Sequence, residues 1–267
     1  MSETTKYKNW KLIWEDDFNG SSLDGNKWNV RLGNWITDSQ GRPVISGWGN
    51  REKQYYTGAP DNLYLKDGCL YLTARRQPSP EQFGQRCSYT SARIDTHGHF
   101  SFRYGKVEFR ARCPLGTGLW PAVWMLPEKS VYGPWAASGE IDILEAKGRL
   151  PRCVFGTIHY GGVSPDKTLQ EYSHELPAQE SIGDFHVYEL IWEERCIRWL
   201  IDGTEYASAS SWESADSSIV YPQPFDQPFY LLINLAVGGW FDMDALDQVD
   251  ESSFPAHFII DYIRVYQ

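Results

Sequence analysis

The sequence has few of the features that mark nucleic-acid-binding and membrane proteins. Its 25 lysines and arginines are outnumbered by 35 acidic residues, the formal net charge is −10, and there is no basic tract. This balance argues against a nucleic-acid or anionic-membrane partner and favours neutral or cationic ligands. No apolar stretch reaches the roughly 20 residues that a membrane helix needs. The first ten residues also lack a hydrophobic signal region.

Cysteine is scarce and irregularly placed. The five cysteines are odd in number and include no C-x-x-C pair, so neither a structural zinc nor a redox pair is expected. Cys69, Cys113 and Cys196 lie in or beside strand-like runs. A free cysteine in such a place behaves as a small hydrophobe.

Long helical stripes are missing, and the dominant hydrophobic period is two. Val107, Phe109 and Ala111 alternate with charged residues, which predicts a half-buried strand. Residues 229–237 and 258–266 are apolar on both faces, as in strands at the middle of a stacked sheet. The pattern predicts an all-β protein.

The composition favours one large domain. Aromatic residues make up 15% of the 267 residues, 23 glycines and 15 prolines punctuate the strand-like runs, and no linker or repeat divides the chain. A chain of this size buries roughly 70–75% of its unfolded surface without disulfides or metals. We expect a β-sandwich or jelly roll of two antiparallel sheets, over residues 10–267, preceded by a tail at residues 1–9.

The most informative segment is residues 140–145, where three carboxylates interrupt an apolar strand. Glu140 and Asp142 share one face of a regular strand, whereas Glu145 points to the other. A single β-bulge among residues 143–145 would bring all three onto one face, and bulges commonly lie beside active sites. A calcium site or an exposed strand edge are the alternatives, and the apolar neighbours argue against an edge.

Retaining glycoside hydrolysis would explain why three acids converge on one face. That reaction needs two carboxyl groups about 5–5.5 Å apart, one ionised as nucleophile and one protonated as acid. Close approach of like charges raises the pKa of one of them, which keeps it protonated near neutral pH. A third carboxyl can share a proton with the nucleophile. The segment therefore favours catalysis.

The tryptophans fit a carbohydrate cleft, because sugar rings present apolar C–H faces. Trp120 and Trp124 lie on one face of a predicted strand, Trp135 precedes the acidic segment, and Trp48 sits in a glycine-flanked loop. Each alone is more typical of a core, but 12 tryptophans in one acidic chain favour a platform role for some. His159 is a lone histidine in a predicted strand, and its sequence context alone predicts a structural role.

The acidic segment, Gly139–Glu145, resembles the signature E-x-D-x-x-E of glycoside hydrolase family 16 in its bulged, laminarinase-like form. Several motifs in one order are far more specific than any single one. Further segments resemble motifs of the family in the same order over nearly the whole chain: residues 14–20, 48–57, 89–93, 102–108, 118–127, 234–239 and 261–267.

The resemblance implies a jelly-roll sandwich with a concave cleft. It implies an endo-acting, retaining hydrolase that cleaves β-1,3-glucan, mixed-linkage β-1,3-1,4-glucan, or both, without a catalytic cofactor. Glu140 would be the nucleophile and Glu145 the general acid/base, with Asp142 hydrogen-bonded to the nucleophile. The other positions carried over are Asn50 and Arg93 for sugar hydroxyls on the non-reducing side of the cut, Trp120, Trp124 and Trp135 for the cleft lining, and His159 beside the catalytic pair.

Many members of this family also hold a structural calcium on the convex side, away from the chemistry. The corresponding positions are Asp17, the carbonyl of Gly68, and Asp261. The resemblance thus implies a calcium ion with a structural role.

The sequence departs from the common pattern at three places. Ala136 follows Trp135 where proline is frequent, Trp240–Met243 follows the double glycine, and Thr96–Phe100 holds two histidines where lysine is common. The last two border loops, which set subsites. These departures leave undecided which polysaccharide is the substrate, but they do not affect the expected reaction.

Other functions on the same scaffold are an agar-type galactan hydrolase, a transglycosylase and a glucan-binding lectin. The net charge weighs against sulfated galactans, and the three intact carboxylates weigh against a lectin. Long polysaccharides do not enter a cytoplasm, so the native form is expected to be secreted, at the cell surface or periplasmic, with the signal absent from this sequence. We expect a monomer.

Overall fold

The computed structural model describes residues 9–162, 166–213 and 217–267, and these residues are almost entirely β-strand, turn and loop. The predicted tail, residues 1–9, lies outside the described residues apart from Asn9. Within the described ranges, no helix has the length and apolar character needed to cross a membrane.

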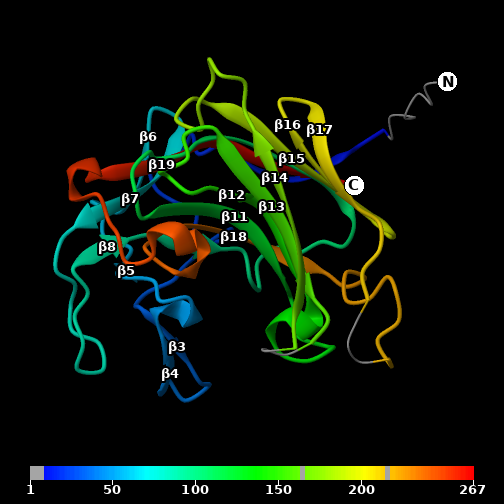
Figure 1. Ribbon diagram of the computed structural model, residues 1–267, viewed down its shortest axis with the longest axis horizontal. Coiled ribbons are helices and arrows are strands. Elements are labelled where there is room, and N and C mark those ends of the chain that lie inside the picture. Colours follow the sequence, from blue (N-terminus) through cyan, green and yellow to red (C-terminus); the bar gives the residue numbers. More distant parts are fainter. Residues whose placement is uncertain (1–8, 163–165, 214–216) are drawn as a thin grey trace.

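Two large sheets form a sandwich (Figure 1), as the sequence predicted. Among the described residues the first sheet has ten strands: β1 (Leu12–Asp16), β5 (Gln54–Tyr56), β6 (Leu63–Lys66), β7 (Cys69–Arg76), β8 (Tyr89–Ser91), β10 (Gly105–Arg112), β15 (His186–Glu193), β16 (Cys196–Ile201), β17 (Thr204–Ala209) and β19 (Ala256–Tyr266). The second has seven: β2 (Asn29–Val30), β9 (Arg93–Asp95), β11 (Leu119–Pro127), β12 (Glu140–Glu145), β13 (Cys153–Tyr160), β14 (Thr168–Glu175) and β18 (Phe229–Val237).

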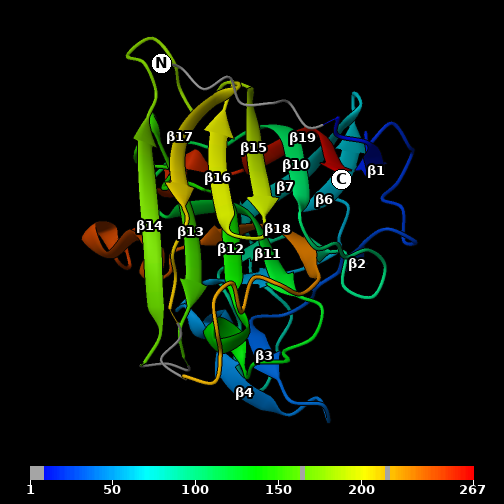
Figure 2. The same ribbon diagram turned by 90° about the vertical axis from the view of Figure 1, so that its right-hand side faces the viewer.

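The strand order explains the hydrophobic patterns. The ten-stranded sheet runs β17-β16-β15-β10-β19-β7-β8-β5, with β1 also paired to β19 and β6 to β7. The seven-stranded sheet runs β14-β13-β12-β11-β18-β9-β2 (Figure 2). The two runs predicted to be central are β18 and β19, and both lie between other strands of their sheets. Their inner faces pack on the opposite sheet, and neighbouring strands cover both of their edges, which accounts for their many apolar residues.

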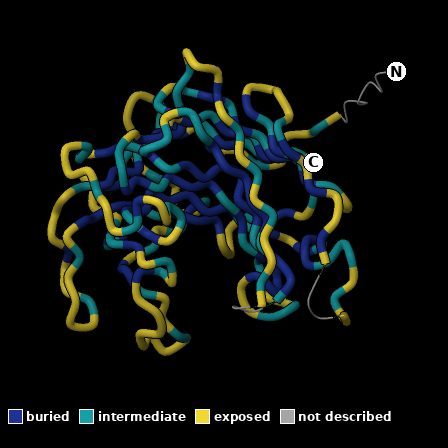
Figure 3. Tube along the Cα trace, viewed as in Figure 1, coloured by how far each residue is buried: buried dark blue, intermediate teal, exposed yellow. Residues whose placement is uncertain are grey.

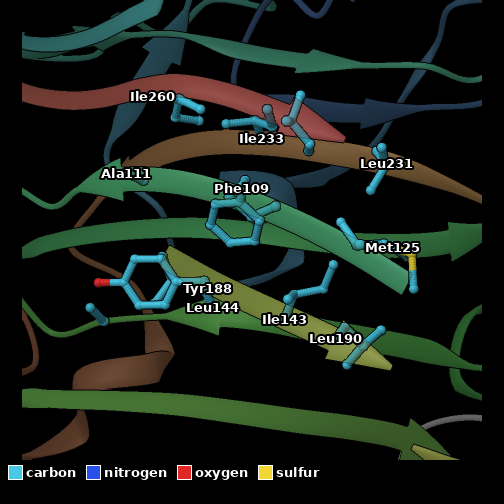
Figure 4. Close-up of a cluster of buried hydrophobic side chains, with 14 of the residues drawn as sticks. Phe109, Ala111, Met125, Ile143, Leu144, Tyr188, Leu190, Leu231, Ile233 and Ile260 are labelled. Carbon is cyan, nitrogen blue, oxygen red and sulfur yellow. The ribbon is translucent and has the colours of Figure 1, made fainter. Parts of the chain in front are cut away.

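The hydrophobic core lies between the two sheets (Figure 3). Val107, Phe109 and Ala111 of β10 are fully buried, in agreement with the period-two prediction. The ring of Phe109 stacks on that of Tyr188 at 5.3 Å between centroids. Leu144 of β12 joins the same cluster from the opposite sheet (Figure 4). The inner faces of both sheets thus interdigitate in one core.

A small third sheet departs from the predicted two antiparallel sheets. Strands β3 (Trp35–Thr37) and β4 (Pro43–Ser46) pair only with each other in the described structure. Strands β5 and β8 are parallel, whereas every other ladder is antiparallel among the residues described. No local pattern marks β3 and β4, which are short and mostly exposed, and so the sequence did not predict them.

In the described part of the chain the helical segments are short 3₁₀ turns, and the thiols are unpaired. The turns are η1 (Gly47–Gly49), η2 (Trp135–Ser138), η3 (Trp240–Ala245) and η4 (Glu251–Ser253). The five cysteines, all within the described ranges, are free. Cys69 and Cys196 begin strands and Cys113 directly follows one, as predicted.

Candidate active site

The acidic strand β12 contains the predicted bulge. Asp142 lies opposite Thr157 of β13, and Glu145 lies opposite Phe155, so three steps along β12 match two along β13. The ladder to β11 shifts at the same place. One extra residue restores the alternation, and Glu145 faces the same side as Glu140 and Asp142. All three carboxylates line one cleft.

The bulge is held from behind by the opposite sheet. Trp199 of β16 is fully buried, and its indole N–H donates to the backbone carbonyl of Asp142 at 2.8 Å. The indole lies against Gly156 of β13, where a Cβ would come within 2.5 Å of Trp199 Cδ1. Only glycine leaves room for this ring. The core side of the sandwich therefore fixes the backbone that aims the carboxylates.

The cleft lies on the outer face of the seven-stranded sheet and has a volume of about 960 Å³. The predicted substrate-binding residues all contribute to it. From the sequence-predicted set these are Asn50, Arg93, Trp120, Trp124, Trp135, Glu140, Asp142, Glu145 and His159. The structure therefore brings together residues from four strands and two loops.

Two tryptophans hold the outer carboxylates. The indole N–H of Trp135 donates to Glu140 Oε2 at 2.9 Å, and that of Trp120 donates to Glu145 Oε1 at 2.9 Å. Trp135 adopts a φ of 45°, which is uncommon for a bulky residue and clusters at functional sites. Trp124 instead donates to Asn234 Oδ1 at 2.7 Å. These residues position polar groups as well as offering apolar ring faces.

His159 is a cation among the acids. Its Nε2 lies 3.2 Å from Asp142 Oδ2 and 3.5 Å from Glu140 Oε1. Burial opposes its charge, but the contact with Asp142 and the nearby carboxylates raise the pKa of His159 to about 9. The sequence alone gave His159 a structural role, whereas the family resemblance put it beside the catalytic pair, and the ring lies in the acidic cluster. Cross-strand pairing with Glu140 places it there.

The surroundings of Glu140 and Glu145 raise the pKa of both carboxyl groups. Burial, followed by the charge of Asp142, raises the pKa of Glu140 to about 7, while His159 acts to lower it. The same two causes raise the pKa of Glu145 well above its ordinary value. Both shifts favour the protonated form, and Glu140, unlike Glu145, lies within 3.5 Å of the His159 ring that opposes its shift.

At one end of the cleft, an arginine is clamped between two indoles. The guanidinium of Arg93 lies 4.4 Å from the ring centroid of Trp48 and 4.9 Å from that of Trp124. Cation–π contacts of this kind fix the orientation of a planar guanidinium. The positive φ of Trp48, 52°, turns the loop so that its ring reaches Arg93.

Sequence reasoning missed a buried carboxylate beside Asn50. Glu52 accepts hydrogen bonds from Asn50 Nδ2 at 3.2 Å, Gln54 Nε2 at 2.6 Å and the hydroxyl of Tyr56 at 3.0 Å. Burial raises its pKa, and the charge of Arg93 lowers it in part. Glu52 thereby orients the amide of Asn50. Its position in the family-like segment 48–57, two residues after Asn50, was the available signal.

Three further cleft residues also escaped the sequence analysis. Asn234 is a lone polar residue in an otherwise apolar strand, which was a usable signal. Phe241 stacks on Trp120 at 5.1 Å, and Lys167 lies 4.4 Å from the ring of Trp135. Neither has a local pattern that distinguishes it from an ordinary loop residue, because their contacts depend on how distant segments fold back on the cleft.

Two of the positions implied for calcium lie side by side. Asn19 donates to Asp17 Oδ2 at 2.8 Å, and hydrogen bonds from Asn19 lower the pKa of Asp17. Gly68 has a φ of 72°, and a Cβ there would lie 3.0 Å from Asn19 Oδ1. The loop of Gly68 thus lies against the loop of Asp17.

The third position, Asp261, accepts a hydrogen bond from Arg110 Nη1 at 2.7 Å through Oδ2. Burial and then the charge of Asp261 raise the pKa of the thiol of Cys69, the neighbour of Gly68. A carboxylate, a carbonyl and a second carboxylate are donors that suit a hard cation such as Ca²⁺. The donor chemistry fits, although Asp261 already has a cationic partner.

The bulged acidic strand, the tryptophan-lined cleft and the sandwich define a class of carbohydrate-active protein. The family model described as Glycosyl hydrolases family 16 matches residues 50–263. The chain therefore belongs to glycosyl hydrolase family 16.

Individual relatives cover nearly all of the chain. A glucan endo-1,3-beta-glucosidase A1 of Niallia circulans is 44% identical over 96% of this chain, which spans only 38% of that protein. A beta-glucanase of Rhodothermus marinus is 38% identical over 98% of this chain and 87% of its own length. The solved endo-beta-1,3-glucanase of Pyrococcus furiosus superposes with a TM-score of 0.83 at 36% identity, covering 97% of this chain and 94% of that one.

Proposed function

We propose that this protein is a retaining endo-glycoside hydrolase that cleaves β-1,3-glucan, mixed-linkage β-1,3-1,4-glucan, or both. The observation that carries the proposal is the bulge in β12, which turns Glu140, Asp142 and Glu145 onto one face of the cleft. The activities named for the family relatives support the same reaction.

In the first step, Glu145 would donate its proton to the glycosidic oxygen while Glu140 attacks the anomeric carbon. The bond to the leaving sugar breaks, and a covalent glycosyl–enzyme ester forms. The raised pKa of Glu145 supports its role as the acid, because burial and the charge of Asp142 favour its protonated form. The indole N–H of Trp135 stabilises the ionised Glu140 before attack.

In the second step, the Glu145 carboxylate would take a proton from water, whose oxygen attacks the anomeric carbon. The ester bond to Glu140 breaks, and the sugar leaves with its original configuration. Asp142 and His159 would keep the charge of the cluster balanced as Glu140 loses and regains its negative charge. No cofactor takes part in either step.

Asn50 and Arg93 would bind sugar hydroxyls on the non-reducing side of the cut, and the indoles of Trp120, Trp124 and Trp135 would line the cleft. The support is their placement on the walls of the same cavity. The stacked guanidinium of Arg93 leaves its edge N–H groups for oxygen acceptors.

The test is a product profile on laminarin, barley mixed-linkage glucan and agarose. Oligosaccharides released from one or both of the first two, but not from agarose, would support the proposal, and their relative rates would rank the substrates. Sugar release from agarose alone would move the protein to galactan hydrolysis. Longer products from oligosaccharides would indicate transglycosylation, and binding without release would indicate a lectin.

We also propose that Asp17, the carbonyl of Gly68 and Asp261 hold a structural calcium, with no part in the chemistry. The support is their oxygen-donor set and the adjacent placement of the first two. We further propose that the protein is a monomer and that residues 10–267 form a single domain. We expect it to act outside the cytoplasm, because its polysaccharide substrates are found there.

A further inference from the structure

The β3–β4 hairpin projects from the sandwich as a sheet of its own (Figures 1 and 2). Ile36 lies directly opposite Ile45 in its register. Directly opposed residues share a face, and their side chains are in contact range. Both side chains line the cleft that holds the catalytic carboxylates. Val44 neighbours Ile45 along the strand and therefore points to the other face.

The isoleucine pair is open to solvent. Ile36 is 39% exposed and Ile45 is 49% exposed, and neither belongs to the core between the sheets. Ligand sites are typically apolar surfaces in a concavity, with a few polar groups that fix orientation. The cleft-lining residues of the hairpin, Ile36 and Ile45, carry no charge. This wall therefore suits an uncharged ligand with an apolar face.

The base of the hairpin is fixed to the body. Asn34 Nδ2 donates to the carbonyl of Glu52 at 3.0 Å, and the amide of Gly47 donates to Asn34 Oδ1 at 3.0 Å. The indole N–H of Trp48 donates to the carbonyl of Gly33 at 3.1 Å. These bonds hold both strands where they leave the body.

The tip of the hairpin is fixed as well. Asp38 Oδ1 accepts from the amide of Arg42 at 2.9 Å, and Oδ2 accepts from Arg42 Nε at 2.6 Å. An isolated two-stranded hairpin is marginal in water, so these anchors matter. With both ends tied, the isoleucine pair is pre-organised, which reduces the entropy lost when a ligand binds.

The hairpin lies at the Arg93 end of the cleft, because Trp48, which follows β4, stacks on Arg93 of β9. Strands β11 and β18 lie between β12, which carries the carboxylates, and β9, which carries Arg93. The distance between β12 and β9 is therefore three strand spacings, or about 14 Å. A sugar chain that crosses the carboxylates therefore reaches the hairpin only after more than one residue on that side.

We infer that Ile36 and Ile45 form a distal binding platform for an uncharged glucosyl residue of the β-glucan chain. The inference rests on the proposed function and deepens it. The C–H face of the sugar packs on the two aliphatic side chains, and the platform favours long chains over short ones. Its contribution is to affinity, since it lies far from the bond that breaks.

The experiment compares β-1,3-linked hexasaccharide and trisaccharide by calorimetry, in a Glu140→Ser background that stops turnover. The test variant combines Ile36→Thr with Ile45→Thr, which keeps the β-branch and replaces a larger apolar group with a hydroxyl. The matched control is Val44→Thr, an isosteric change on the opposite face. We expect the double variant to weaken hexasaccharide binding about threefold to tenfold, with a smaller loss for the trisaccharide. The control should match the parent.

A gain variant makes the test independent of any loss of hairpin structure. Ile45→Trp enlarges the apolar platform and should tighten hexasaccharide binding more than trisaccharide binding. Unchanged hexasaccharide affinity in both the double variant and Ile45→Trp would overturn the platform, and so would an equal loss in Val44→Thr.

The two proposals fail in different ways. If the unaltered protein hydrolyses β-glucan but the hairpin variants bind like the parent, only the platform is wrong. If the protein hydrolyses no glucan but binds hexasaccharide with the expected dependence on the hairpin, only the hydrolase is wrong. If it neither hydrolyses nor binds, both are overturned.

Discussion

His159 Nε2 lies 3.2 Å from Asp142 Oδ2 in the floor of the cleft. The two residues come from adjacent strands, and the pair joins a histidine ring, which can carry positive charge, to the middle of three carboxylates. The bulge brings three buried carboxyl groups together, and His159 is the residue of β13 whose positive charge can offset their negative charge. The pair therefore sets how easily the proposed nucleophile ionises.

We predict that His159→Gln moves the acid limb of the kcat/KM profile to higher pH. The limb reports ionisation of Glu140, whose pKa is about 7 and is lowered by the charge of His159. Removing that charge raises the pKa further, by about one pH unit or more. His174→Gln is the control, because His174 packs on Tyr206 outside the cleft. An unmoved limb in His159→Gln would contradict this role.

Glu145→Ala should fold normally and reduce turnover by about 10²–10⁴, the usual contribution of general acid–base catalysis. Added azide should partly restore turnover of an activated aryl glycoside and yield a β-glycosyl azide, since the nucleophile is intact. Product analysis by NMR decides the outcome. An α-configured azide, or undiminished turnover, would reject the assignment.

Glu140→Ser should lose nearly all hydrolysis while still binding oligosaccharide. The covalent intermediate cannot form, whereas the cleft walls are unchanged. Calorimetry with an oligosaccharide and a reducing-sugar assay measure the two properties on one sample. Glu128→Ser, at a carboxylate outside the acidic strand, is a control for loss of a nearby acid. Full activity in Glu140→Ser would exclude it as nucleophile.

Trp199→Phe should lower the free energy of unfolding by about 1–3 kcal/mol, because it leaves the buried carbonyl of Asp142 without its indole donor. Activity should fall too, since that bond fixes the bulge. Denaturant titration and kcat give the two readings. Trp212→Phe is a matched control, because Trp212 also donates to a backbone carbonyl, that of Pro222. Equal loss of kcat in both variants would show that the effect is not specific to the bulge.

Calcium should raise the melting temperature and a chelator should reverse the rise. Binding at a hundredfold excess over Kd adds about 2.7 kcal/mol to stability. Asp17→Asn should remove the calcium response, whereas Asp24→Asn, at an acid that caps its own loop through Asn26, should keep it. A melting temperature that ignores calcium in the unaltered protein would refute the metal site.

Local patterns predicted much of this architecture. The alternation of Val107, Phe109 and Ala111 predicted a strand, and the run at 229–237, apolar on both faces, predicted a central strand. Both predictions were possible because the spacing of apolar residues along a strand reflects whether one face or both faces are buried. The bulge followed from the odd spacing between Asp142 and Glu145. The exposed β3–β4 hairpin did not follow, because neither of its strands contributes a face to the core.

What the sequence determined by itself is the all-β sandwich, the family, and the acidic segment Glu140–Glu145, since these depend on residue order and spacing along one stretch of chain. Only the tertiary structure decided that His159 faces the acids, that Trp199 locks their backbone, and that Ile36 and Ile45 extend the cleft. The physical reason is that these contacts arise from strand register and sheet packing, which join segments far apart in the sequence.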